Sequence, residues 1–257
     1  MFKFVNTLEK KQMKSNQEFK NQALSALKGN WGKAVLLTLL LALVASFVSG
    51  PVTYKSLQLQ TYVQEQVGPY SSPASVASLM SDSTYLELLK ALYGMSGVTS
   101  ILQILLFLPL TVGFANALKL LLSGNAELVD NAVSIGFKNK YWRNVLTMLW
   151  LQILVFLWSL LFVIPGLIKA FSYAMTPYIL HDNPELSPTE AIHRSRMMMR
   201  GHKFDLFWLI LSFIGWLLLC VLTVGIGFLW LLPYMETATA AFYEEVKADY
   251  ALHGGLD

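Results

Sequence analysis

The chain has 257 residues, of which 55% are hydrophobic and only 14% are charged, whereas soluble domains average about 45–50% and about 25%. With a mean hydropathy of +0.50, it has too little polar surface to cover a globule in water, which excludes an ordinary soluble protein. The net charge of +3 is too small to indicate a nucleic-acid-binding protein. The single cysteine, Cys220, excludes a disulfide framework and a cysteine metal site.

Apolar runs of near-membrane length recur along the chain. After a flexible basic N-terminus (1–14), they predict a multi-pass membrane domain over residues 15–246 and a C-terminal tail over 247–257. Between the first two runs, the polar segment 53–96 is predicted to be extracellular, and Gly50-Pro51 to close the first run. We expect an all-α membrane protein with about six transmembrane helices, near residues 31–52, 98–122, 145–164, 167–180, 205–224 and 226–243.

A second kind of helix precedes some of these runs. Ser187-Pro188-Thr189-Glu190 is a capping box with proline at the first helical position. The helix that it opens has an apolar stripe that includes Met198 and Met199 on one side and arginines on the other, and Gly201 ends it. Ser15-Asn16-Gln17-Glu18 is a similar capping box, and its helix ends at Gly29. Both patterns predict amphipathic helices that lie on the membrane surface.

The order of these pieces favours an internal repeat. Three amphipathic segments end at Gly29, Gly136 and Gly201, and basic and aromatic residues follow before a span begins. The second span of each pair carries a glycine, at positions 113, 166 and 227. The pattern predicts three repeats of a surface helix plus a transmembrane hairpin, although interfacial chemistry alone could recreate it.

The distribution of lysine and arginine predicts the orientation. With the amino terminus inside, sixteen of the 19 basic residues fall on the inner side, and only Lys55, Lys90 and Lys169 fall outside. Both termini are therefore predicted to be cytoplasmic.

Several segments also carry a resemblance to a known family. They are Gly29-Asn30-Trp31-Gly32, the stretch from Met199 to Phe207, Ser212 to Trp216, Gly225-Ile226-Gly227, and Pro233-Tyr234 through to Tyr243. They resemble a family of bacterial integral membrane proteins catalogued as domain of unknown function 975, over roughly residues 15 to 246. The resemblance implies a multi-pass protein of the bacterial cytoplasmic membrane, and it carries over no catalytic residue.

One acidic residue, Glu236, lies well inside an apolar run. Ionisable groups within spans are costly, so Glu236 is a candidate intramembrane polar site, or else a structural residue that a neighbouring hydroxyl holds. If the fourth and sixth spans are equivalent in the repeat, its nearest partners are Tyr173 and Thr176, and Lys169 reaches it only if the helices are offset. No histidine pair has metal-ligand spacing, and no nucleophile motif or phosphate-binding glycine loop occurs. We therefore expect no enzyme activity, no metal and no cofactor.

The basic residues near the predicted inner surface are the second set of candidates. Near an anionic leaflet each contributes about 1 kcal/mol, so they are candidate contacts to lipid headgroups, against the simpler alternative of plain anchoring: Arg194, Arg196, Arg200, Lys203, Lys138, Lys140 and Arg143. The expected partners are the bilayer and its anionic headgroups, with no nucleic acid, and a homo-oligomer or another membrane partner stays open.

Three functional classes remain. The favoured one is a non-enzymatic membrane protein in lipid binding or in membrane and envelope homeostasis. The alternatives are a transporter of a small solute or lipid that uses Glu236, and an intramembrane enzyme.

Overall fold

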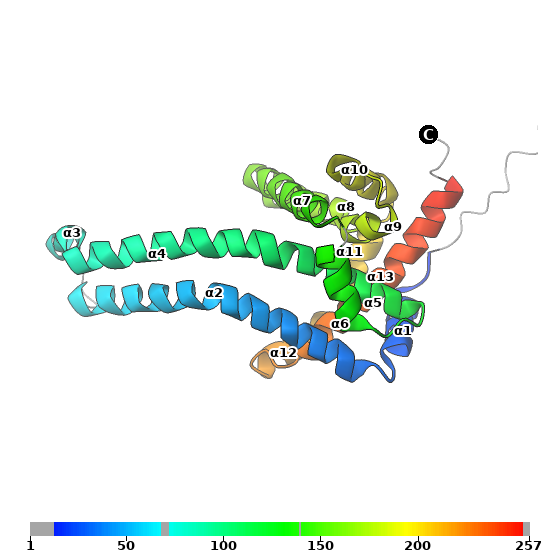
Figure 1. Cartoon of the computed structure of the whole chain (residues 1–257), viewed down its shortest axis with the longest axis horizontal. Coiled ribbons are helices and arrows are strands. Elements are labelled where there is room, and N and C mark those ends of the chain that lie inside the picture. Colours follow the sequence, from blue (N-terminus) through cyan, green and yellow to red (C-terminus); the bar gives the residue numbers. More distant parts are fainter. Residues whose placement is uncertain (1–12, 68–71, 139, 254–257) are drawn as a thin grey trace, which may run out of the picture. The chain divides into compact units, whose positions relative to one another are not determined.

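The computed structural model describes residues 13–67, 72–138 and 140–253, and Figure 1 shows the chain. Most of the predicted flexible N-terminus lies outside these residues. Every regular element within them is a helix, which confirms the all-α class; η1 and η2 are π-helical. In chain order the elements are α1 (Asn16–Leu27), α2 (Trp31–Val67), α3 (Pro73–Ser81), α4 (Ser83–Leu102), η1 (Gln103–Phe107), α5 (Leu108–Leu122), α6 (Leu128–Val133), η2 (Ser134–Lys138), α7 (Tyr141–Leu161), α8 (Val163–Tyr173), α9 (Thr176–Asp182), α10 (Pro188–Met198), α11 (Lys203–Leu211), α12 (Ile214–Leu222) and α13 (Phe228–His253).

Within the described residues, five helical segments are long and apolar enough to cross a membrane: Trp31–Val67, Ser83–Leu122, Tyr141–Leu161, Val163–Asp182 and Lys203–Leu222. The chain is therefore a membrane protein. The sixth predicted span, 226–243, lies in α13, which is not among the five. The reason is composition, because α13 carries Glu236, Glu244 and Glu245 among its apolar residues. Within the helix, Thr237 is fully buried and Glu236 has a tyrosine partner.

The chain divides into two compact units, Met1–Leu39 with Pro109–Asp257, and Leu40–Leu108. The smaller unit contains most of α2 together with α3, α4 and η1, so the predicted polar segment 53–96 is largely helical. Gly50-Pro51 does not end α2, because Pro51 lies inside the helix, as spans tolerate. At 1.5 Å per residue, the 37 residues of α2 extend about 55 Å, well beyond a hydrocarbon core of about 30 Å.

A hydrogen bond fixes the far end of this smaller unit. The Tyr62 hydroxyl of α2 donates to the carboxylate of Asp82 at 2.8 Å, and the backbone N–H of Tyr85 donates to the same carboxylate at 2.9 Å. Asp82 thereby caps α4. The two donors, Tyr85 first, lower the pKa of the Asp82 carboxyl below its ordinary value.

In the larger unit, the amphipathic helices pack on protein. Both capping boxes form as predicted, at Ser15 and at Ser187. The apolar stripe of α1 lies on α13, where the rings of Phe19 and Phe242 meet edge to face with centroids 5.5 Å apart. The stripe of α10, including Met198, is buried against α7, α8 and α9. The two helices therefore form where the sequence predicts them, but other helices cover their apolar stripes, which we had expected to face the membrane.

Two glycines allow backbones to touch where α5 meets α6 and η2. A β-carbon at Gly113 would lie 1.9 Å from the carbonyl oxygen of Ala132, and one at Gly136 would lie 2.7 Å from that of Pro109. Gly166 has a similar role in the α7–α8 hairpin, where a β-carbon would lie 2.1 Å from the Ser159 hydroxyl oxygen. Since neighbouring backbone cannot move aside cheaply, these positions require glycine.

We therefore expect Gly113→Ala to destabilise the fold by about 1–3 kcal/mol, the usual cost of overpacking. The matched control is Gly215→Ala on α12, where a β-carbon meets nothing within 4 Å; it should be neutral, or stabilising by up to about 1 kcal/mol. Thermal unfolding of both variants in one detergent measures the difference. Equal midpoints for both variants and the parent would refute the close approach.

Candidate functional site

A charged cluster joins α5, α9 and α13 in the larger unit. Asp182, the last residue of α9, forms ion pairs with Lys119 of α5 and Lys247 of α13. The Tyr243 hydroxyl donates to the same carboxylate at 2.9 Å, and the Nδ1 of His181 lies 3.3 Å from it. We call these five residues the Asp182 cluster. Sequence analysis did not predict it, because Lys119, Tyr243 and Lys247 lie 61 to 65 positions from Asp182 in the chain, and only His181 is adjacent.

Burial makes this cluster important for stability. The side chain of Lys119 is only 6% exposed and that of Asp182 only 13%. A buried ammonium group without a counter-charge is strongly destabilising. The aromatic rings of Tyr178 and Tyr243 stack beside the cluster with centroids 4.8 Å apart, and so bring α9 against α13.

The predicted intramembrane acid has a different partner from those expected. The Tyr178 hydroxyl donates to Glu236 at 2.6 Å, whereas the Thr176 hydroxyl donates to the carbonyl of Tyr173 at 2.7 Å. Lys169 lies over the ring of Trp158 at 4.3 Å and is not paired with Glu236. The choice of Tyr173 and Thr176 assumes one continuous helix over 167–180, but α8 ends at Tyr173 and α9 begins at Thr176. This break changes which side chains face α13.

Two of the predicted headgroup contacts instead hold the carbonyl end of α9. The terminal nitrogens of the Arg143 guanidinium donate to the carbonyl oxygens of Asn183, at 3.1 Å, and Leu180. Lys140 donates to the carbonyl of Pro184. Cations at the carbonyl end of a helix complement its dipole and satisfy its unpaired acceptors. Arg194 is also engaged, because its guanidinium lies 5.9 Å from the ring centroid of Tyr250.

The basic candidates line two separate cavities. Arg200 and Lys203 lie at a groove of about 590 Å³, whose other lining residues are apolar or glycine: Ile164, Leu167, Ile168, Phe171, Gly201, Phe204 and Phe207. Lys138, Lys140 and Arg143 line a pocket of about 370 Å³ together with Val112, Ile135, Asn144, Leu180, His181 and Pro184. We call these the Arg200 groove and the Lys138 pocket. Arg194 and Arg196 line neither.

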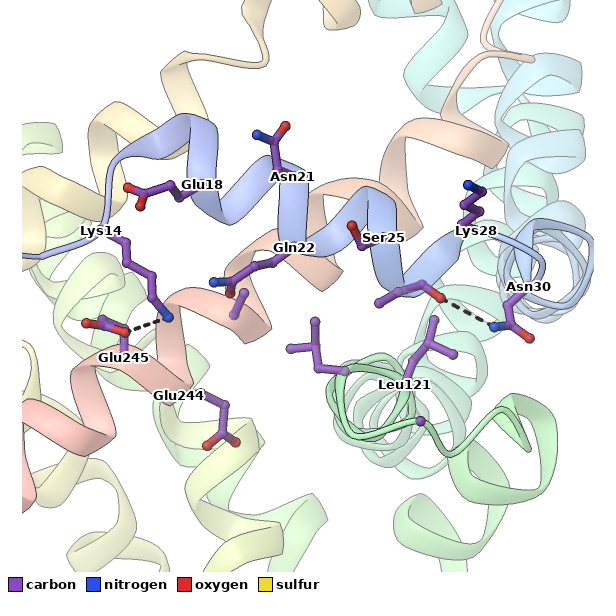
Figure 2. Close-up of a pocket in the computed structure, with 14 residues that line it drawn as sticks. Lys14, Glu18, Asn21, Gln22, Ser25, Lys28, Asn30, Leu121, Glu244 and Glu245 are labelled. Carbon is purple, nitrogen blue, oxygen red and sulfur yellow. Dashed lines mark hydrogen bonds and ion pairs between the residues drawn. The ribbon is translucent and has the colours of Figure 1, made fainter.

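A third cavity, of about 850 Å³, is polar and lies between α1, α5 and α13. Figure 2 shows the polar side chains of α1 along its rim and an ion pair between Lys14 and Glu245, 2.9 Å long. Sequence analysis missed this cavity. The signal was available in the polar face of α1, where residues 14, 18, 21, 22, 25 and 28 recur at helical spacing. The opposed charges on its rim indicate a partly self-neutralised surface.

The match to a family model covers residues 13–250, and the model is described as Protein of unknown function (DUF975). The chain belongs to this family. The resemblance noted from the Gly29–Gly32 and Met199–Phe207 segments is thus confirmed over slightly more of the chain than expected. No curated protein and no solved structure matches this chain. Within the described part of the chain, no three His, Cys, Asp or Glu side chains are grouped so that they could hold a metal ion.

The Asp182 cluster makes a direct prediction for stability. Asp182→Asn removes the carboxylate charge and leaves the Lys119 ammonium buried, so we expect a loss of about 3–5 kcal/mol in unfolding free energy. The control Asp205→Asn removes a carboxylate that is 46% exposed and lies 3.3 Å from His202, and should cost about 1 kcal/mol or less.

The measurement is thermal or denaturant unfolding in one detergent. The double variant Lys119→Met with Asp182→Asn should recover part of the loss, because it also removes the stranded charge. A double variant whose losses simply add would contradict a direct pairing of the two side chains.

Proposed function

We propose that this DUF975 member is a non-catalytic membrane protein that binds an anionic phospholipid. The observation that carries the proposal is the Arg200 groove. Its walls come from α8 and α11, where Phe171 and Phe207 meet edge to face with centroids 5.9 Å apart. Both of its charged lining residues, Arg200 and Lys203, are cations. Apolar walls beside cations match a lipid, which joins acyl chains to a charged headgroup.

The exposure of the groove residues supports this proposal. The side chain of Ile164 is 71% exposed and that of Phe204 is 75% exposed. In water such side chains favour aggregation or a partner, whereas in a bilayer they contact acyl chains. Because lipid tails are as apolar as the walls, the walls add little preference among lipids. Selectivity then rests on the headgroup, and two cations at about 1 kcal/mol each would favour an anionic over a zwitterionic lipid roughly 30-fold.

The orientation belongs to the same proposal. We place both termini and the loops around residues 123–143 and 181–203 in the cytoplasm, at the bacterial plasma membrane, because most basic residues fall there. The Arg200 groove then opens toward the inner leaflet, where anionic lipids attract basic segments. The alternative role of Glu236 in solute transport gains no support from its contacts, since its hydrogen bond from Tyr178 fits a structural role equally well.

Lipid selectivity tests the function. In nanodiscs that contain equal amounts of phosphatidylglycerol and phosphatidylcholine, native mass spectrometry should detect retained phosphatidylglycerol on the parent protein. Arg200→Gln with Lys203→Gln should reduce this preference about 10- to 30-fold. The charge-matched control, Lys28→Gln with Lys90→Gln, changes two exposed lysines outside the groove and should leave it intact. Equal preferences in the two double variants would refute the groove as the lipid site.

Thiol labelling tests the orientation. In a Cys220→Ala background, single cysteines replace the exposed residues Ser78 of α3 and Glu185 between α9 and α10. An impermeant reagent added to intact cells should label the cysteine at 78 and not the one at 185, whereas permeabilised cells should label both. Labelling at 185 in intact cells would reverse the proposed orientation.

A further inference from the structure

The Lys138 pocket lies where α7 begins and α9 ends. Its volume of about 370 Å³ falls within the ordinary range of ligand pockets, about 300–1,000 Å³. Three of its lining residues are cations, Lys138, Lys140 and Arg143, and none is a carboxylate. Of the neighbouring carboxylates, Asp182 is already paired with Lys119 and Lys247, and Glu185 attracts Arg143 but does not line the pocket. The pocket is therefore a region of excess positive charge.

The contacts of Arg143 leave one of its donors unused. Its two terminal nitrogens donate to carbonyl oxygens around the end of α9, which fixes the guanidinium plane. Its Nε is buried and has no hydrogen-bond partner within the described residues. A buried donor without an acceptor costs about 1–3 kcal/mol. Since the Nε has no accessible surface, a ligand in the pocket would not contact it, and Arg143 contributes to the pocket through its charge.

The start of α7 also favours an anion. The helix is 21 residues long, and its N-cap residue, Lys140, forms no side-chain capping hydrogen bond. Lys140 also adopts φ of 50°, a left-handed conformation that residues other than glycine rarely take. Backbone N–H groups at a helix start, together with the positive end of its dipole, favour an anion.

We propose that the Lys138 pocket binds a phosphate group. Lys138 and Lys140 supply charge and hydrogen bonds from their ammonium groups, and Arg143 supplies charge. Lys138 is exposed and can swing onto a ligand, whereas Arg143 is held in place by the carbonyls of α9. A phosphate group carries the negative charge that the lining of this pocket lacks. The phosphate is carried either by a lipid headgroup or by a small soluble molecule. The site shares no residue with the Arg200 groove.

The experiment uses the full chain in phosphatidylcholine nanodiscs, where no anionic lipid competes. In one arm, isothermal titration with inorganic phosphate and with glycerol 3-phosphate measures binding of a soluble ligand. In the other arm, native mass spectrometry measures retention of phosphatidate added to the nanodiscs, on protein that carries Arg200→Gln and Lys203→Gln so that the Arg200 groove does not retain the lipid. We expect binding in at least one arm, and the arm identifies the source of the phosphate.

The variants test the pocket itself. Lys138→Gln with Lys140→Gln should weaken binding at least tenfold, whereas Lys138→Arg with Lys140→Arg should preserve it because the charge remains. Lys28→Gln with Lys90→Gln should leave it unchanged, because both lysines lie outside the pocket. Lys138→Gln alone, at an exposed side chain, serves if the double variant does not fold, and should weaken binding severalfold. Absence of binding in both arms, or binding that is unchanged when Lys138 and Lys140 lose their charge, would overturn the proposal.

Discussion

The ion pair between Lys119 and Asp182 constrains how the larger unit is assembled. Within a bilayer, apolar contacts between helices give little net drive, because lipid tails are as apolar as the side chains that they replace. Specific polar pairs and close packing must therefore fix which helices meet and in what register. Asp182 draws Lys119 of α5 and Tyr243 of α13 to the end of α9. The close approach of Gly113 to the backbone of α6 then fixes how α5 packs against α6.

The amphipathic helices show why hydrophobic periodicity alone does not assign a location. A stripe such as that of α10 fits a membrane surface and a protein surface equally well, because both are apolar. In this chain, Met199 is fully buried and Phe19 is 1% exposed, so these stripes are part of the protein core. The arginine face of α10 also contacts protein, because Arg194 lies over the ring of Tyr250. Periodicity predicts which residues are buried, and only the contacts identify what covers them.

Much of the fold follows from local signals in the sequence. The capping boxes at Ser15 and Ser187 predict where α1 and α10 begin, because the signal lies within four residues. The break between α8 and α9 has no capping box, and its only local signal is Pro177 at the start of α9; the sequence analysis overlooked this proline and expected other partners for Glu236. Pro51 led to the opposite error. The sequence analysis ended the first span at Gly50-Pro51, whereas α2 continues through the proline. The Asp182 cluster could not be predicted, because one sequence does not reveal pairs that lie some sixty positions apart.

The basic residues near the predicted inner surface divide into those that hold the fold and those left for a ligand. Arg143 and Lys140 satisfy the carbonyl end of α9, yet the Nε of Arg143 stays unmet. Arg200 and Lys203 border apolar walls, so acyl chains fit beside them, whereas the Lys138 pocket offers mainly donors. Between the two sites the chain forms α10, whose 11 residues extend about 16 Å. The two proposed sites share no lining residue, so each would bind a ligand of its own.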